Sequence, residues 1–309
     1  MIKKVVEVAS PARLSVRHQQ LLIERGDDEA ASIPCEDIGI LLVEHPAVTY
    51  THGVFVTLNA FGAVIIFCGP DHLPAGIVLP AAGHHESAAR IGTQVEASLP
   101  LKKGIWKTTI RAKLCQQAAL LAERGEEGGA LLAMAGRVRS GDSENLEAQA
   151  ARRYWPLLMG PDFRRERGGA PPNHLLNYGY MVFRAAMARA LTAAGLLPAL
   201  GVNHHAKRNT FALADDLGEP YRPLVDWRVR QMVDAGEGLD PALNRPQRAA
   251  LLALFNETVR FDGERLPLLA AMGRTAVSLV RCFAEKRTDP IFPEGMPLPP
   301  DGATDDADT

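Results

Sequence analysis

The chain has 309 residues, which is enough for roughly two domains at ~150 residues each. Its apolar fraction of 47% and charged fraction of 23% are ordinary for a packed protein and exclude a predominantly disordered chain. No apolar run approaches the ~20 residues that a helix needs to cross a bilayer, so we expect no membrane span. The formal net charge is −2, which by itself does not point to a nucleic-acid partner.

The cysteines and the N-terminus indicate the compartment. The four cysteines are widely scattered without metal-ligand spacing, so we expect reduced thiols. Charged residues interrupt residues 1–8 before an apolar signal-peptide core can form, and this segment is typical of a first β-strand. These features together predict a cytoplasmic protein.

The first 82 residues have the pattern of short β-strands. Strands are predicted at residues 5–8, 12–16, 20–24, 38–43, 63–68 and 76–79. Residues 51–61 predict one short helix, which Gly62 ends. We interpret residues 1–82 as a small β-rich domain.

Helical periodicity replaces this pattern after residue 83. Helices are predicted at residues 85–97, 103–123, 130–138, 143–158, 174–194, 216–235, 245–258 and 266–286. Proline, glycine and aspartate dominate the end of the chain, which predicts a disordered acidic tail at residues 291–309. The predicted fold class is therefore α+β, with the β-rich domain followed by a larger, all-helical domain at residues 83–290.

Positive charge is concentrated in residues 152–208. Nine basic residues and two acidic ones give this stretch +7, so the rest of the chain carries −9. A local positive field attracts phosphates even when the whole chain is slightly acidic. A solvated basic face is the ordinary alternative, and charge alone favours it.

Residues around Glu147 form one candidate site. Ser143 is positioned to cap a helix on which Glu144, Glu147 and Ala151 share a face. Small neighbouring residues allow another helix to approach, which would place Glu147 in a crevice. An amphipathic surface helix whose glutamates pair with arginines is the alternative, and this pattern leaves both open.

A second candidate site combines histidines with acids. His204 and His205 lie on a predicted turn, and Asp215, Asp216 and Glu219 follow at the start of a predicted helix. Imidazole and carboxylate groups suit Mg²⁺ or Mn²⁺. Acids also commonly cap helix N-termini, so spacing alone does not decide between a metal site and a cap.

Five blocks of sequence carry a resemblance to a known family. They are residues 106–117, 138–155, 173–180, 200–204 and 215–226. Glu-x-x-Ala-Ala-x-x-Tyr-Trp from residue 147 and Leu-Asn-Tyr-Gly-Tyr from residue 176 are its most specific parts. In this order the blocks resemble the CRISPR-associated endonuclease and integrase family of spacer acquisition (Cas1), most like its type II branch. Gly218 departs from the family pattern, which usually has a larger apolar residue there.

The resemblance implies a function and its machinery. It implies a metal-dependent DNA endonuclease and integrase that inserts new spacer DNA into a CRISPR array by 3′-OH attack on repeat-boundary phosphodiesters. Glu147, His204 and Glu219 would hold Mg²⁺ or Mn²⁺, with His205 as a substitute for His204. The resemblance also implies a homodimer formed through the β-rich domain, double-stranded protospacer and repeat DNA as substrates, and a small ferredoxin-like partner, Cas2.

Basic residues near these blocks are candidates for binding DNA phosphates. They are Arg164, Arg165, Arg167, Lys207 and Arg208. Two other functions stay open: a non-catalytic DNA-binding scaffold and a general metal-dependent phosphoesterase. The intact Glu-His-Glu set argues against the scaffold, and a phosphoesterase for small molecules would need no basic stretch.

Overall fold

Two four-stranded sheets form the N-terminal part of the chain, in a computed structural model that describes residues 3–26, 30–81, 83–204, 206–237 and 240–299. The first sheet contains, in spatial order, β1 (Lys4–Val8), β5 (Ile38–Val43), β7 (Val64–Cys68) and β8 (Pro74–Val78), with only β8 antiparallel to its neighbour. The second contains β4 (Ala31–Pro34), β3 (Gln20–Glu24), β2 (Arg13–Arg17) and β6 (Thr49–Tyr50). Helix α1 (His52–Ala60) packs beside them.

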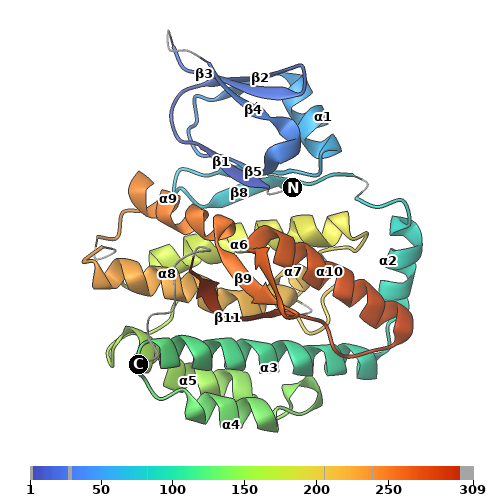
Figure 1. Cartoon of the computed structure of the whole chain (residues 1–309), viewed down its shortest axis with the longest axis vertical. Helices are drawn as coiled ribbons and strands as arrows, with labels where there is room; N and C mark the ends of the chain where they lie inside the picture. The colour runs from blue at the N-terminus through green and yellow to red at the C-terminus, as the bar shows by residue number, and fades with distance from the viewer. Residues whose placement is uncertain (1–2, 27–29, 82, 205, 238–239, 300–309) are drawn as a thin grey trace.

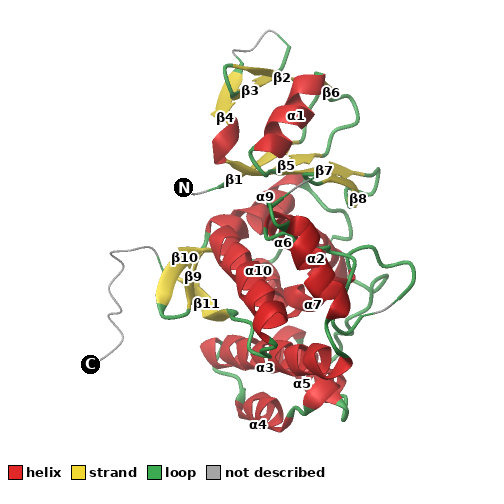
Figure 2. Cartoon of the chain, turned by 90° about the vertical axis from the view of Figure 1, so that its right-hand side faces the viewer, coloured by secondary structure: helices red, strands yellow, loops and turns green. Residues whose placement is uncertain are grey.

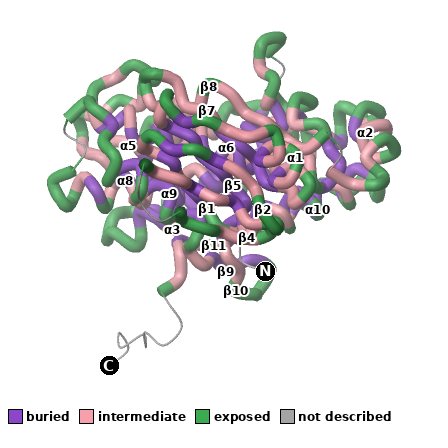
Figure 3. Tube along the Cα trace, turned by 90° about the horizontal axis from the view of Figure 1, so that it is seen from above, coloured by how far each residue is buried: buried purple, intermediate pink, exposed green. Residues whose placement is uncertain are grey.

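Strand β5 of the first sheet is buried on both faces, since every one of its residues is buried. Successive side chains of a strand point to opposite faces. Ile40 and Leu42 therefore join the core of the helical region, whereas Leu41 and Val43 join the core of the β-rich part. The sheet thus lies between the two regions and connects them (Figure 1), and β5 lies near the centre of the molecule in the view from above (Figure 3).

Nine α-helices follow in the described residues. They are α2 (Ser87–Glu96), α3 (Leu99–Glu123), α4 (Gly129–Arg137), α5 (Leu146–Met159), α6 (Asn173–Ala193), α7 (Ala212–Gly218), α8 (Arg222–Asp234), α9 (Arg245–Ala253) and α10 (Leu268–Glu285). Helices α3, α4 and α5 form a layer beneath α6 and α10 (Figure 2). At Gly179 an added Cβ would lie 2.4 Å from Val225 Cγ1, so glycine allows α6 to pack closely against α8.

The α+β class is confirmed, but the second region is not all-helical. It contains an antiparallel sheet of β9 (Thr258–Phe261), β10 (Glu264–Pro267) and β11 (Pro293–Leu298). Asp262 and Gly263, both with positive φ, form the tight hairpin turn between β9 and β10. Asp-Gly between strands is a hairpin signal, and the helical periodicity on either side obscured it.

The predicted disordered tail is wrong for the residues of β11. This strand pairs with β9, and the side chains of Phe292 and Met296 are buried. Gln116 Nε2 on α3 donates a hydrogen bond to the carbonyl of Pro293 at 2.7 Å. Composition missed the strand because its partners lie far away in the sequence. Residues 300–309 lie outside the described residues, as does residue 82, the predicted domain boundary.

Two further predictions concern the membrane and the cysteines. None of the helices in the described part of the chain is long and apolar enough to span a membrane. The four cysteines are free thiols, with Cys35 and Cys282 buried and Cys115 exposed on α3.

Candidate active site

Glu147 lies in the first turn of α5, where Asp142 fixes the start of the helix. The helix begins at Leu146, three residues later than predicted, and Ser143 does not cap it. Instead, the Asp142 carboxylate accepts hydrogen bonds from the backbone N–H groups of Leu146 (2.9 Å) and Glu147 (3.0 Å). An acid at a helix N-terminus satisfies free amides and complements the helix dipole. Two bonds from one carboxylate therefore hold the backbone that carries Glu147.

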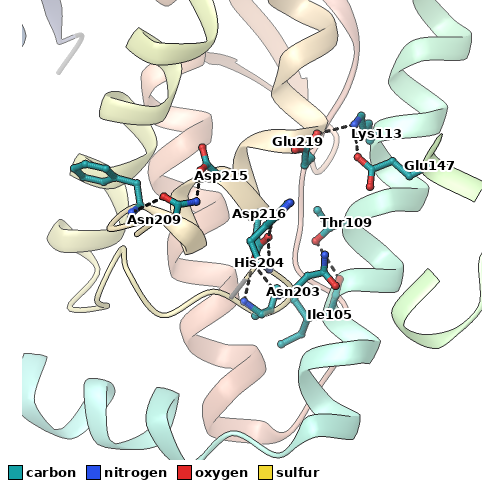
Figure 4. A network of polar contacts seen from close by, with 12 residues as sticks. Ile105, Thr109, Lys113, Glu147, Asn203, His204, Asn209, Asp215, Asp216 and Glu219 are labelled. Atoms are coloured by element: carbon teal, nitrogen blue, oxygen red, sulfur yellow. Dashed lines mark hydrogen bonds and ion pairs between the residues drawn. The ribbon is translucent and has the colours of Figure 1, made fainter. Parts of the chain in front are cut away.

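Lys113, in the middle of α3, joins the two predicted carboxylate ligands. Its Nζ donates to Glu147 Oε1 at 2.6 Å and to Glu219 Oε2 at 2.7 Å, so the ammonium lies between them (Figure 4). Burial would lower the pKa of Lys113, but Glu219 and Glu147 outweigh burial and raise it. The lysine is therefore a buried cation.

Glu219 lies where the sequence predicted a continuous helix over residues 216–235. The helix is interrupted instead: α7 ends at Gly218, a 3₁₀ turn covers Glu219–Tyr221, and α8 begins at Arg222. Pro220 and Pro223 occupy first-turn positions of these last two elements, where a missing N–H costs no intrahelical bond.

Glu219 is 2% exposed, and two cations hold its carboxylate. Arg222 Nη1 lies 2.8 Å from Glu219 Oε1, opposite the bond from Lys113 to Oε2. Burial would raise the pKa of Glu219, but Arg222 and Lys113 hold it below its usual value. Glu219 is therefore a buried, ionised carboxylate.

His204 is oriented by Asp216, which is fully buried. The Asp216 carboxylate accepts hydrogen bonds from the backbone N–H groups of Val202 (2.7 Å), Asn203 (2.9 Å) and His204 (3.3 Å), and it contacts Nδ1 of the His204 ring. At Gly201 an added Cβ would lie 2.8 Å from Asp216 Oδ2, so the turn that leads to His204 requires glycine.

This contact determines which ring nitrogen of His204 is available. An ionised carboxylate only accepts hydrogen bonds, so Nδ1 carries the hydrogen and Nε2 keeps its lone pair in the neutral ring. The hydrogen bond to Asp216 raises the pKa of His204 above its ordinary value, although burial opposes the shift. The Trp106 ring meets the imidazole edge-on, with 5.6 Å between ring centres. His205, the alternative ligand, lies outside the described residues.

The three acids that the sequence grouped together have different partners. Asp215 pairs with Arg184, with 2.6 Å between Oδ1 and Nε, and accepts from Asn209. Asp216 orients His204, and Glu219 alone joins the pair with Glu147. Asp215 and Asp216 are neighbours within α7 and have different partners, whereas Glu219 lies where that helix ends.

The donors fit a hard divalent cation. Two carboxylates already converge on one cation, the Lys113 ammonium, and a histidine oriented by a carboxylate lies near Glu219. Among the described residues, however, Glu147, His204 and Glu219 do not form a cluster in which all ligand atoms lie within 4.8 Å of one another. The structure thus joins the two carboxylates directly and places the imidazole beside them.

One group of described residues meets this distance criterion elsewhere, at His84, His85 and Glu86. The guanidinium of Arg90 already pairs with Glu86 at 2.8 Å, and the two imidazole rings stack on each other. A cation there would be repelled by the Arg90 guanidinium and by the positive end of the α2 dipole, so this group is a poor metal site.

A cleft of about 370 Å³ adjoins the carboxylate pair. Its lining includes Lys113 and four arginines: Arg165, Arg167, Arg184 and Arg222. Two of these, Arg165 and Arg167, are among the predicted phosphate-binding residues, whereas Arg184 and Arg222 were missed. The sequence gives little sign that Arg184 and Arg222 line the same cleft, although Arg222 lies three residues after Glu219.

The remaining predicted phosphate-binding residues lie outside this cleft lining. Arg164 donates to the carbonyls of Pro161 and Phe163 within its own loop. Lys207 and Arg208 are exposed on the loop that follows His204.

A buried polar group supports the floor of the cleft. Asp226 accepts hydrogen bonds from the hydroxyls of Tyr154, at 2.8 Å, and Tyr180. Burial raises the pKa of Asp226 to about 6. Arg165 and Arg222 both stack on the Tyr180 ring, at 5.2 and 5.1 Å from its centre. The tyrosine thereby positions two of the four arginines.

Comparison with known proteins agrees with the sequence motifs. The family model described as "CRISPR associated protein Cas1" matches residues 6–252. The chain is 35% identical over 294 residues to the CRISPR-associated endonuclease Cas1 of Neisseria meningitidis, covering 94% of this chain and 96% of that protein. The chain therefore belongs to the Cas1 family, and the prediction made from the sequence motifs is confirmed.

Two solved structures share the fold. One is a casposase bound to an integration product, with a TM-score of 0.74, 19% identity and 94% of both chains covered. The other is a Cas6-RT-Cas1–Cas2 complex, with a TM-score of 0.72 and 16% identity, covering 94% of this chain and 36% of that longer one.

Proposed function

We propose that this chain is a metal-dependent DNA integrase and endonuclease that inserts spacer DNA into a CRISPR array. The observation that carries the proposal is the convergence of Glu147 and buried Glu219 on one cation beside an arginine-lined cleft. Mg²⁺ or Mn²⁺ held by Glu147, His204 and Glu219 would polarise the phosphate and stabilise charge on the attacking or leaving oxygen.

The residues of the cleft supply phosphate binding. Asp215 holds Arg184 and Glu219 holds Arg222, so both guanidinium groups are oriented before DNA arrives. A DNA 3′-OH then attacks a phosphodiester at the repeat boundary. The new bond forms as the old one breaks and releases another 3′-OH, so the step needs no further reactant.

The partners of this reaction follow from the family. We infer that the chain acts as a homodimer on double-stranded DNA in the cytoplasm, together with the small ferredoxin-like protein Cas2. Supporting this, one protein of the same fold is bound to an integration product and another is part of a Cas1–Cas2 complex. Light scattering of the purified chain with and without Cas2 measures the stoichiometry, and a monomer that does not bind Cas2 would contradict the inference.

The central experiment incubates the protein with a repeat-bearing plasmid and a labelled duplex. We expect joined products with Mg²⁺ or Mn²⁺, none when the duplex ends in a 3′-dideoxynucleotide, and none for Glu147→Gln. Glu144→Gln is the matched control, because Glu144 is a nearby surface residue that pairs with Arg137 and Arg139. DNA binding without products would support a scaffold, and hydrolysis of a small phosphodiester without joining would support a phosphoesterase.

A further inference from the structure

Lys113 lies between the two carboxylates that would hold a metal ion. Its Nζ lies 2.6 Å from Glu147 Oε1 and 2.7 Å from Glu219 Oε2, distances typical of charge-assisted hydrogen bonds. Only 9% of the lysine is exposed. A divalent ion and an ammonium cannot share two carboxylates at such distances, because their repulsion is strong where water is excluded. Metal binding must therefore displace the Lys113 ammonium.

We propose that Lys113 is a positioning residue that couples metal binding to DNA binding. It holds Glu147 and Glu219 together before the metal arrives, and it moves toward the adjoining cleft when metal and a DNA phosphate bind together. The inference rests on the proposed function and assigns this residue a role in it.

The lining of the cleft supplies the reason for the coupling. Lys113 lines the same cleft as Arg165, Arg167, Arg184 and Arg222. The lining also includes Asp215, which pairs with Arg184, and Asp226, which accepts from two tyrosine hydroxyls. With four guanidinium groups against two carboxylates, the cleft still repels a displaced ammonium unless a further anion lies in it. A DNA phosphate is such an anion, so it favours displacement of the lysine and hence metal binding. By thermodynamic reciprocity, the metal strengthens DNA binding by the same factor.

Lys113→Met tests the coupling because it keeps the apolar stem and removes the charge. Mn²⁺ binding is measured by electron paramagnetic resonance, without DNA and with a phosphorothioate-linked duplex. We expect the Kd for Mn²⁺ alone to fall about tenfold or more, equivalent to ~1.4 kcal/mol. The duplex strengthens Mn²⁺ binding by the wild type and has little effect on the variant. Lys107→Met, which removes a charge from the same helix, serves as the control and behaves as wild type.

A second measurement uses the wild-type chain and does not depend on how the variant folds. Saturating Mg²⁺ should displace the ammonium even without DNA and so increase reductive methylation of Lys113, read by mass spectrometry with Lys107 as internal reference. Unchanged methylation, or Mn²⁺ affinity in folded Lys113→Met that is equal to or weaker than wild type, would overturn the inference. If Mn²⁺ binding by the wild type is absent or indifferent to Glu147→Gln, the proposed function fails. If Mn²⁺ binding depends on Glu147 but is unaffected by Lys113→Met, only the inference about Lys113 is overturned and the proposed function stands.

Discussion

The carboxylates and the imidazole of the candidate site are held in different ways. Glu219 is 2% exposed, and two cations fixed on α3 and α8 hold its two oxygens. The His204 side chain is 43% exposed, lies in a loop, and depends on one aspartate. Helix packing thus pre-organises the carboxylate half, whereas a short backbone turn around Asp216 orients the imidazole half. Changes to the first half should affect stability and activity together, and changes to the second should affect mainly activity and its pH dependence.

The largest effect is expected for Glu219→Ala. It should abolish integration and lower the free energy of unfolding by ~3–5 kcal/mol, because Lys113 and Arg222 lose the buried acid between them. Glu147→Ala should abolish integration with a smaller loss of stability, since the Glu147 side chain is 27% exposed. Urea denaturation and the plasmid assay measure both. Full activity of either variant would refute the site. Equal losses of stability would refute the larger structural role of Glu219.

Asp216→Ala should have the next largest effect. It leaves three backbone N–H groups without their acceptor, which costs ~1–3 kcal/mol. It also frees the His204 ring, so Mn²⁺ affinity should fall by about 10–100-fold. Asp215→Ala is the comparison: it releases Arg184 and should weaken DNA binding while Mn²⁺ affinity is retained. Identical losses in both variants would mean that Asp216 acts only through general packing.

The pH dependence of His204 distinguishes the imidazole half from the carboxylates. Its pKa is raised in the folded protein, so the folded state binds more protons than the unfolded state. The stabilising contribution of His204 is therefore complete below the unfolded pKa of ~6.5 and is lost as pH rises through the folded pKa. Metal binding has the opposite preference, because a proton on Nε2 removes the lone pair.

Lowering the pH should therefore reduce integration, and added Mn²⁺ should partly restore it. Manganese titrations at about pH 5.5 and 7.5, on either side of an ordinary histidine pKa, measure this for wild type, His204→Ala and His205→Ala. We expect His204→Ala to lose most activity together with the Mn²⁺ rescue, and His205→Ala to keep both. An inactive His205→Ala with an active His204→Ala would reassign the ligand to the neighbouring residue.

The smallest effect is expected at the junction before Glu219. Gly218 has an ordinary helical φ of −71°, and an added Cβ would meet no atom within 4 Å. Gly218→Ala should therefore raise the free energy of unfolding by ~0.4–1 kcal/mol, by restricting the unfolded chain. Thermal denaturation measures the change. A loss of stability would show that the junction needs the freedom of glycine.

The sequence predicted what local patterns encode. Alternation and helical periodicity predicted most of the strands and helices, because each depends on side chains only a few residues apart. The motifs identified the family and singled out Glu147, His204 and Glu219. Periodicity failed at β9 and β11, which pair with each other although α10 separates them in the sequence.

How the site is held together depends on contacts between residues that are distant in the sequence. Lys113 meets Glu147 across 34 residues of sequence and Glu219 across 106, and no local pattern relates them. Arg165, Arg184 and Arg222 likewise share one cleft only because α6 and α8 bring their segments together. Ion pairs of this kind arise from the packing of helices that are distant in sequence. Their geometry, and with it the charge balance of the site, therefore becomes visible only in the folded chain.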